Sequence, residues 1–220
     1  MLVTYEDIRN DESIKCYITE ADKALSALGY TEHSFPHVVK AATMAEMILL
    51  TLNYPKRTAE LAKIAGYMHD IGNIVNRIDH AQSVAVMAFR LLDRMGMDPA
   101  EIAMVISAIG NHDESTAAAV NPIAAALILA DKTDVRRSRV RNHDFASFDI
   151  HDRVNYAVEE SKIYFNEDNS AIILDLKIDT SISAVMDYFE IFLGRMILCR
   201  KAAEFLNISF ELVINGQRLL

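Results

Sequence analysis

The feature of this sequence that most constrains its fold is the helical spacing of apolar residues up to about residue 160. The segment from Val38 to Leu52 is rich in alanine, methionine, isoleucine and leucine, and Pro55 closes it. Apolar residues at intervals of three and four form a stripe along one side of a helix, and a globular protein buries that stripe. Further stripes run from Leu61 to Met68, from Val84 to Met95, from Ile102 to Ile109 and from Pro122 to Asp131. We therefore predict several helices that share one core.

Two of these helices have recognisable starts. Asp98-Pro99 and Asn121-Pro122 each join a side chain that can cap a helix to a proline in the first helical position. These pairs predict helices that begin at Pro99 and Pro122.

The pattern changes after Ser161. Lys162–Phe165 and Ala171–Ile178 are rich in β-forming residues and flank a turn-forming segment, so they predict a hairpin. An amphipathic stripe from Ile182 to Met196 predicts a long helix, and the alternation from Ile208 to Ile214 predicts a strand.

These patterns predict a mainly α fold with two parts. Residues 1–160 form a helical domain, and residues 161–220 form a small β-β-α-β appendage, an α+β unit packed on that domain. A chain of 220 residues buries a sizeable core without disulfides. Cys16 and Cys199 match no zinc or redox spacing, so we expect reduced thiols.

Composition indicates a cytoplasmic protein without a membrane segment. The N-terminus lacks a basic segment followed by an apolar run, and the longest apolar stretch, Ile123–Ala130, is far shorter than the roughly 20 residues that cross a bilayer. The net charge of −9 disfavours binding to nucleic acid. Four arginines within Arg136–Arg141 are the local exception, and they form either a solvated basic face or an anion-binding rim.

Four of the seven histidines lie at ends of predicted helices, where they can converge. His37 and His80 lie at helix starts, and His69 and His112 lie at helix ends. A single histidine is more often an ordinary core or surface residue, but imidazole and carboxylate are the usual ligands of divalent metals. His69-Asp70 supplies both types side by side, so the set predicts a metal site.

The motifs around these residues resemble the HD superfamily of metal-dependent phosphohydrolases, over about residues 30 to 145. The resemblance rests on His37, on His69-Asp70 within Tyr67–Asn73, and on Asp131 within Ile128–Lys132. His80 in Asp79-His80-Ala81 and His112 in Gly110–Asp113 resemble the additional histidines of the two-metal branch.

The resemblance implies a helical bundle with two divalent ions, which could be Mn, Fe, Mg, Co, Ni or Zn. It implies that one ion is held by His37, His69, Asp70 and Asp131. Asp70 would bridge to a second ion held by His80 and His112. We assign catalytic roles to Asp70 and Lys132.

Two positions leave alternatives open. His33 or His37 could be the first ligand, and we favour His37 because Lys40 and small residues follow it as in the family's first helix. Asn73 stands where many relatives carry a lysine that touches the substrate phosphate. Lys132, Arg77 or the arginine cluster that begins at Arg136 would then bind the substrate.

The expected activity is hydrolysis of a phosphoester, in a nucleotide or related small molecule, by metal-activated water. Asp113 and Glu114 either serve in proton transfer or solvate a loop. An HD-fold di-iron oxygenase and a non-catalytic metal- or nucleotide-sensing module are the alternatives. We also expect a homodimer, since the Ile182–Met196 stripe has more apolar surface than a small hairpin covers.

Overall fold

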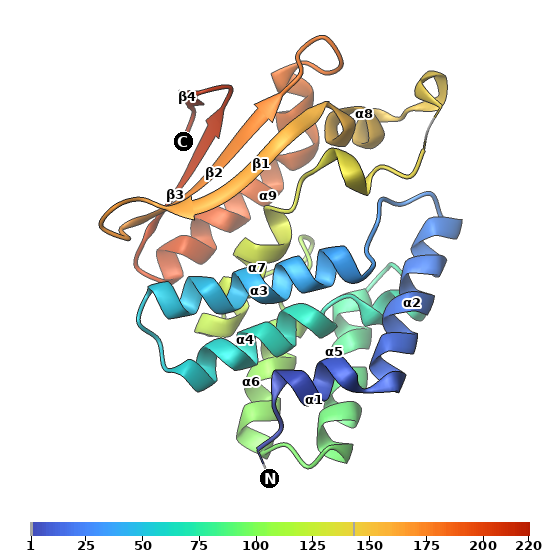
Figure 1. Cartoon of the computed structure of the whole chain (residues 1–220), viewed down its shortest axis with the longest axis vertical. Coiled ribbons are helices and arrows are strands. Elements are labelled where there is room, and N and C mark those ends of the chain that lie inside the picture. The colour runs from blue at the N-terminus through green and yellow to red at the C-terminus, as the bar shows by residue number, and fades with distance from the viewer. Residues whose placement is uncertain (1, 143) are drawn as a thin grey trace.

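The computed structural model describes residues 2–142 and 144–220 and consists of a helical body and a mixed β-sheet at its C-terminal end (Figure 1). The described residues form nine α-helices: α1 (Tyr5–Asn10), α2 (Glu12–Ala27), α3 (Phe35–Thr51), α4 (Lys56–Met68), α5 (His80–Arg94), α6 (Pro99–Gly110), α7 (Pro122–Lys132), α8 (Ile150–Ala157) and α9 (Val185–Phe205). They also form three short 3-10 helices, η1 (Ile71–Ile74), η2 (Arg137–Arg139) and η3 (Phe145–Ser147), and the strands β1 (Val158–Phe165), β2 (Ala171–Ile178), β3 (Ser209–Ile214) and β4 (Gln217–Arg218). The expected mainly α fold with a C-terminal α+β unit is confirmed. No described helix is long and apolar enough to cross a membrane.

Both predicted cap-and-proline starts are present. The Asp98 side chain accepts a hydrogen bond from the backbone of Ala100 at the start of α6, and Asn121 accepts one from Ala124 at the start of α7. These bonds satisfy backbone N–H groups that lack a partner within the helix.

The centre of the helical body is α7. Its residues from Ile123 to Ala130 are all buried, and α7 packs against α3, α4, α6 and α9. A helix that is apolar on every side can be stable in water only where other elements surround it. The longest apolar run of the sequence is therefore the central core helix, and Asp131 near its end is fixed by that packing.

The α3 and α4 helices cross at very short range. A Cβ atom placed on Gly66 of α4 would lie only 2.7 Å from Cα of Ala42 in α3. Glycine at this position permits an approach that any larger residue would block. The close packing brings His37, in the first turn of α3, beside His69, directly after α4.

The sheet has the order β1-β2-β3-β4. β1 and β2 form the predicted antiparallel hairpin, β2 and β3 run parallel with α9 connecting them, and β4 pairs antiparallel with β3. The α9 helix lies behind the sheet in Figure 1 and packs on β2, β3 and α7, so it joins the sheet to the helical body.

Two details of the appendage differ from the prediction. β1 begins at Val158 and not at Lys162, and the two-residue β4 was not expected. The early part of β1 carries Glu159 and Glu160, which are exposed because β1 is an edge strand. Charged residues are common on edge strands, where they do not produce an apolar alternation. The predicted domain boundary falls inside this strand, and the division into two domains stays a prediction.

Candidate metal centre

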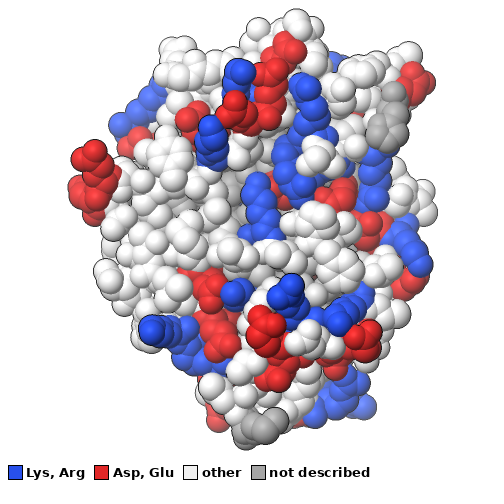
Figure 2. Space-filling view, in the orientation of Figure 1, with Lys and Arg blue, Asp and Glu red and all other residues white. Residues whose placement is uncertain are grey.

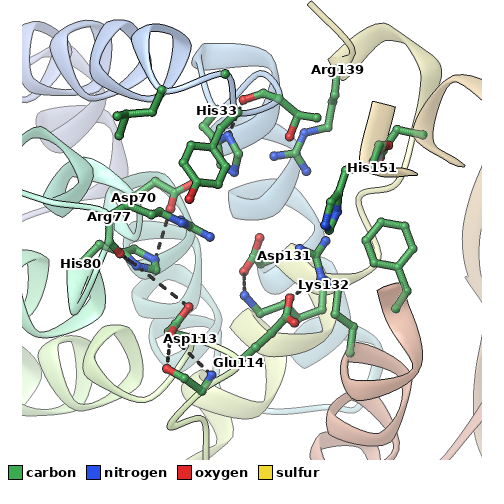
Figure 3. A pocket seen from close by; sticks show the side chains of 18 of the residues that line it. His33, Asp70, Arg77, His80, Asp113, Glu114, Asp131, Lys132, Arg139 and His151 are labelled. Carbon is green, nitrogen blue, oxygen red and sulfur yellow. Dashed lines mark hydrogen bonds and ion pairs between the residues drawn. The ribbon is translucent and has the colours of Figure 1, made fainter. Parts of the chain in front are cut away.

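The six predicted metal ligands come together at one end of the helical body. His37 lies at the start of α3, His69 and Asp70 directly follow α4, His80 begins α5, His112 follows α6, and Asp131 precedes the last residue of α7. Ligand atoms of these residues form three overlapping trios: His37, His69 and Asp70; His69, His112 and Asp131; and Asp70, His80 and His112. The ligand atoms within each trio lie within 4.8 Å of one another. The distances below divide the six residues into two groups that share Asp70. Figure 3 shows Asp70, His80 and Asp131 facing the cavity from three different segments of the chain.

The first group consists of His37, His69, Asp70 and Asp131. His37 Nε2 lies 3.3 Å from His69 Nε2, 3.5 Å from Asp70 Oδ2 and 3.4 Å from Asp131 Oδ1. His69 Nε2 lies 3.2 Å from Asp70 Oδ2 and 3.6 Å from Asp131 Oδ1. Ligands about 2.1 Å from a tetrahedrally bound ion are separated by about 3.4 Å. The spacing of these four atoms therefore suits one common ion.

The second group uses the other oxygen of Asp70. His80 Nε2 lies 3.3 Å from His112 Nε2 and 3.7 Å from Asp70 Oδ1. The two oxygens of Asp70 thus face two different pairs of histidines, as a carboxylate that bridges two ions would. Asp70 Oδ2 is also buried and makes no hydrogen bond. A buried carboxylate oxygen without a donor is costly, so a cation fits this position.

All four histidines are oriented by a contact at their outer nitrogen. The Nδ1 atoms of His69, His80 and His112 lie 2.8, 3.2 and 2.5 Å from the carbonyl oxygens of Gly66, Arg77 and Ile109. Nδ1 of His37 lies 2.8 Å from a carboxylate oxygen of Asp134. A carbonyl or carboxylate oxygen accepts a hydrogen bond from Nδ1–H, which leaves the Nε2 lone pair free for a metal. Each Nε2 atom points into the site.

The pKa shifts in the cluster also fit a site that binds cations. Burial opposes protonation of His69, but Asp70 and Asp131 outweigh it and raise its pKa to about 10. Burial, together with His69 and Lys132, lowers the pKa of His112 to about 3, so this imidazole is a neutral donor. Burial disfavours the charged form of Asp70, yet His69 and His37 hold its pKa well below the usual range.

Asp134 supports the first group from behind. Its carboxylate is fully buried, with Oδ2 at 2.8 Å from His37 Nδ1 and Oδ1 at 2.7 Å from Lys40 Nζ. Burial alone would raise the pKa of Asp134. The neighbouring His37, Arg139 and Lys40 outweigh burial and lower this pKa below its usual value, so the carboxylate is ionised. An ionised carboxylate behind a histidine fixes the ring and strengthens its donor nitrogen. Sequence reasoning missed this residue.

A cavity of about 570 Å³ opens onto the ligands. Its basic lining residues are Arg77, Lys132, Arg139 and Arg195, and its aromatic ones include Tyr30 and Phe192. Arg195 and Phe192 belong to α9, so the appendage forms part of the wall. The sequence had not indicated Arg195, because its contribution depends on how α9 packs against α7.

The predicted substrate-binding residues have different positions. Lys132 lines the cavity, with Nζ 2.7 Å from Asp131 Oδ2. Arg77 also lines the cavity, near Asp70 in Figure 3. Arg136 does not line it, because its guanidinium binds Asp134 and Glu32, at 3.0 and 3.1 Å. The assignment of Arg136 to substrate binding stays a prediction, and its position outside the cavity lining does not support it.

Most arginines of the cluster are bound to acidic side chains or to a backbone carbonyl. Arg136 and Arg141 form ion pairs with Glu32 and Asp22, and Arg137 binds the carbonyl of Tyr156. On the face drawn in Figure 2, Lys and Arg lie among Asp and Glu. Arg139 differs: it is almost fully buried, and its guanidinium reaches the cavity (Figure 3).

The remaining open positions lie around the same cavity. His33 lines it, and Nδ1 of His33 contacts the carbonyl of Thr31, whereas His37 is the histidine within the ligand groups. The geometry therefore favours His37 as the first ligand. Asp113 and Glu114 also line the cavity, where Asp113 binds Ser115 and Glu114 pairs with Arg195.

Asn73 is buried beside Asp70. Its amide nitrogen donates to the Asp70 carbonyl at 2.8 Å and to Asp70 Oδ1 at 3.0 Å, and its oxygen accepts from Arg77 Nη1 at 3.2 Å. Asn73 thus orients Asp70 and holds Arg77 at the cavity.

Comparison with protein-family models matches residues 34–136 to the HD domain. This range contains all six ligand positions and Asp134. Comparison with curated proteins finds no match.

Proposed function

Because this chain contains an HD domain with a buried His/Asp cluster, we propose that it is a phosphohydrolase that uses two divalent metal ions. Its substrate would be a small phosphorylated molecule, of which nucleotides are the leading class. The observation that carries the proposal is the position of Asp70, whose two oxygens face His37 and His69 on one side and His80 on the other.

The ligands fit the chemistry of such ions. His37, His69 and Asp131 would hold one ion with Asp70 Oδ2, and His80 and His112 would hold the other with Asp70 Oδ1. When bound, a pair of ions lowers the pKa of water and stabilises charge on phosphoryl oxygens. The Nδ1 contacts keep the histidines in the tautomer that binds metal.

The basic side chains of the cavity would orient the phosphate. The Lys132 ammonium holds Asp131 and also faces the cavity, so it both positions a ligand and lies within the substrate site. We propose that Arg77, held by Asn73, takes the place of the lysine that many relatives carry at position 73. Arg139 would supply a planar guanidinium, which matches phosphate geometry well.

The cavity favours a small substrate. Its volume and its mixture of basic and aromatic walls suit one phosphorylated molecule with an apolar or planar part beside Tyr30 or Phe192. The net charge of −9 disfavours long nucleic acids.

The experiment is a phosphoesterase panel with protein purified without chelators and reconstituted separately with each candidate metal. We expect metal-dependent release of phosphate from at least one nucleotide or small phosphoester, and loss of that activity in Asp70→Asn. Asp93→Asn, which changes an exposed acid on α5, is the matched control and should retain activity.

Oxygen uptake without phosphate release would support the di-iron oxygenase instead. Bound metal without turnover on any substrate would support a sensing module. Either result would replace the proposed phosphohydrolase activity.

A further inference from the structure

The α9 helix has an exposed face that no other part of residues 2–142 and 144–220 covers. Its buried residues, such as Phe192 and Met196, belong to the hydrophobic core, and the helix packs on α7, β2 and β3. On the opposite side, Met186, Leu193 and Ile197 are 74 %, 48 % and 39 % exposed. The exposed charged residues Glu190, Arg200 and Glu204 lie on the same side of the helix, so the six residues form one line along it. We call this line the α9 stripe: Met186, Glu190, Leu193, Ile197, Arg200 and Glu204.

The four central residues of the α9 stripe are symmetric in their chemistry, whereas the residues at its two ends, Met186 and Glu204, are not complementary. Glu190 lies five positions before Arg195, and Arg200 lies five positions after it. Leu193 and Ile197 lie two positions before and after the same point. If a second α9 helix runs antiparallel to the first about this point, each Glu190 lies opposite an Arg200, and each Leu193 lies opposite an Ile197.

From this symmetry we propose that the α9 stripe binds the α9 stripe of a second copy of this chain in an antiparallel pair. Glu190 would then lie opposite the partner's Arg200, and Leu193 opposite the partner's Ile197. A twofold axis makes each contact twice, as homodimer interfaces do. A parallel pair would instead place like charges opposite each other, which disfavours that arrangement.

The middle of the stripe permits close approach. Gly194 is exposed beside Leu193, and no atom lies within 4 Å of a Cβ placed there. Two helices can approach closely where one side chain is absent, and the leucine and isoleucine beside it would be removed from water. This face is an interaction surface separate from the metal ligands.

One helix pair is a small interface. A helix of 21 residues is about 31 Å long, and contacts of this size fall at the lower end of specific interfaces. We therefore expect a reversible dimer with a dissociation constant of about micromolar order.

Charge reversal tests the antiparallel pairing. Sedimentation equilibrium should show that Glu190→Arg and Arg200→Glu each weaken the dimer by about tenfold or more, because each places like charges opposite each other. The double variant restores opposite charges in both pairs and should recover most of the affinity. Arg90→Glu, on the exposed side of α5, is the matched control and should leave the dissociation constant unchanged.

Disulfide trapping tests whether the dimer interface lies on α9. In a Cys16→Ser background, Gly194→Cys should form a cross-linked dimer on mild oxidation, whereas Val86→Cys on α5 should not. Circular dichroism checks that each variant is folded. A monomer at all concentrations up to about 100 times the expected micromolar constant would overturn the proposal, and so would a dimer that neither single reversal weakens.

Discussion

Asp134 shows how a residue that binds neither metal nor substrate can govern the site. Its carboxylate faces His37, Lys40 and Arg139 while fully buried. We predict that Asp134→Asn lowers metal affinity by about 10- to 100-fold, because the neutral amide no longer stabilises a positively polarised His37 ring. Metal titration by isothermal calorimetry measures the change. An unchanged metal affinity would mean that α3 alone holds His37 in place. Asp93→Asn is again the control and should bind metal as the wild type does.

A substitution at Arg77 tests the proposed binding of the substrate phosphate in the cavity. Its guanidinium lines the cavity, hydrogen-bonds to Asn73 and lies over the Tyr30 ring, 5.4 Å from the ring centroid. We predict that Arg77→Ala raises KM for the phosphorylated substrate by about tenfold and leaves metal content unchanged, since a charge-assisted contact to phosphate is worth about 1.5 to 3 kcal/mol. Arg90→Ala should leave KM as in the wild type. Equal KM values for both variants would exclude Arg77 from substrate binding.

The candidate ligands could be predicted where a motif contains them, but the residues that contact them from behind could not. His37, His69 and Asp131 follow from spacing and resemblance. Asp134 and Arg139 lie just after α7, where the chain forms a turn and η2 without an apolar period to indicate which side chains point inward. Within the arginine cluster, the backbone direction alone decides that Arg139 reaches the cavity and Arg136 does not.

At the scale of elements, the α3–α4 crossing fixes two of the candidate ligands, His37 and His69. Gly66 lies against Ala42, and its carbonyl also contacts His69 Nδ1. We predict that Gly66→Ala destabilises the protein by about 1 to 3 kcal/mol, because the added methyl must push the helices apart. Calorimetry should show a Tm lower by about 2 to 4 °C for each kcal/mol.

The matched control is Val86→Ala on α5. Val86 is helical and 70 % exposed, so alanine should leave Tm unchanged or raise it slightly through its better helix propensity. A Tm for Gly66→Ala equal to that of the wild type would show that the two helices can separate at little cost.

The sequence predicted elements best where two signals agreed. Apolar spacing, caps and proline together located α6 and α7. The start of β1 could not be predicted, because an edge strand with exposed glutamates has no apolar alternation and its pairing with β2 is decided by tertiary contact. A close approach such as that at Gly66 also depends on the arrangement of two helices and leaves no pattern in either one.

At the scale of the whole molecule, the two cysteines report whether α9 stays packed. Cys16 is exposed on α2, whereas Cys199 is buried on α9 and burial raises its pKa to about 12. At pH 8 the Cys199 thiol is protonated and inaccessible, so it should not react. A thiol reagent should label one cysteine in the native protein and two after denaturation. Rapid labelling of native Cys16→Ser would show that α9 detaches from the body.

Metal stoichiometry decides whether Asp70 links two metal sites. Mass spectrometry of metals in protein purified without chelators should give about two ions per chain. His80→Ala and His112→Ala should each reduce this to about one, because the first group keeps its four candidate ligands. Asp70→Asn should reduce occupancy of both sites. Wild-type stoichiometry and turnover in both histidine variants would contradict the two-metal account.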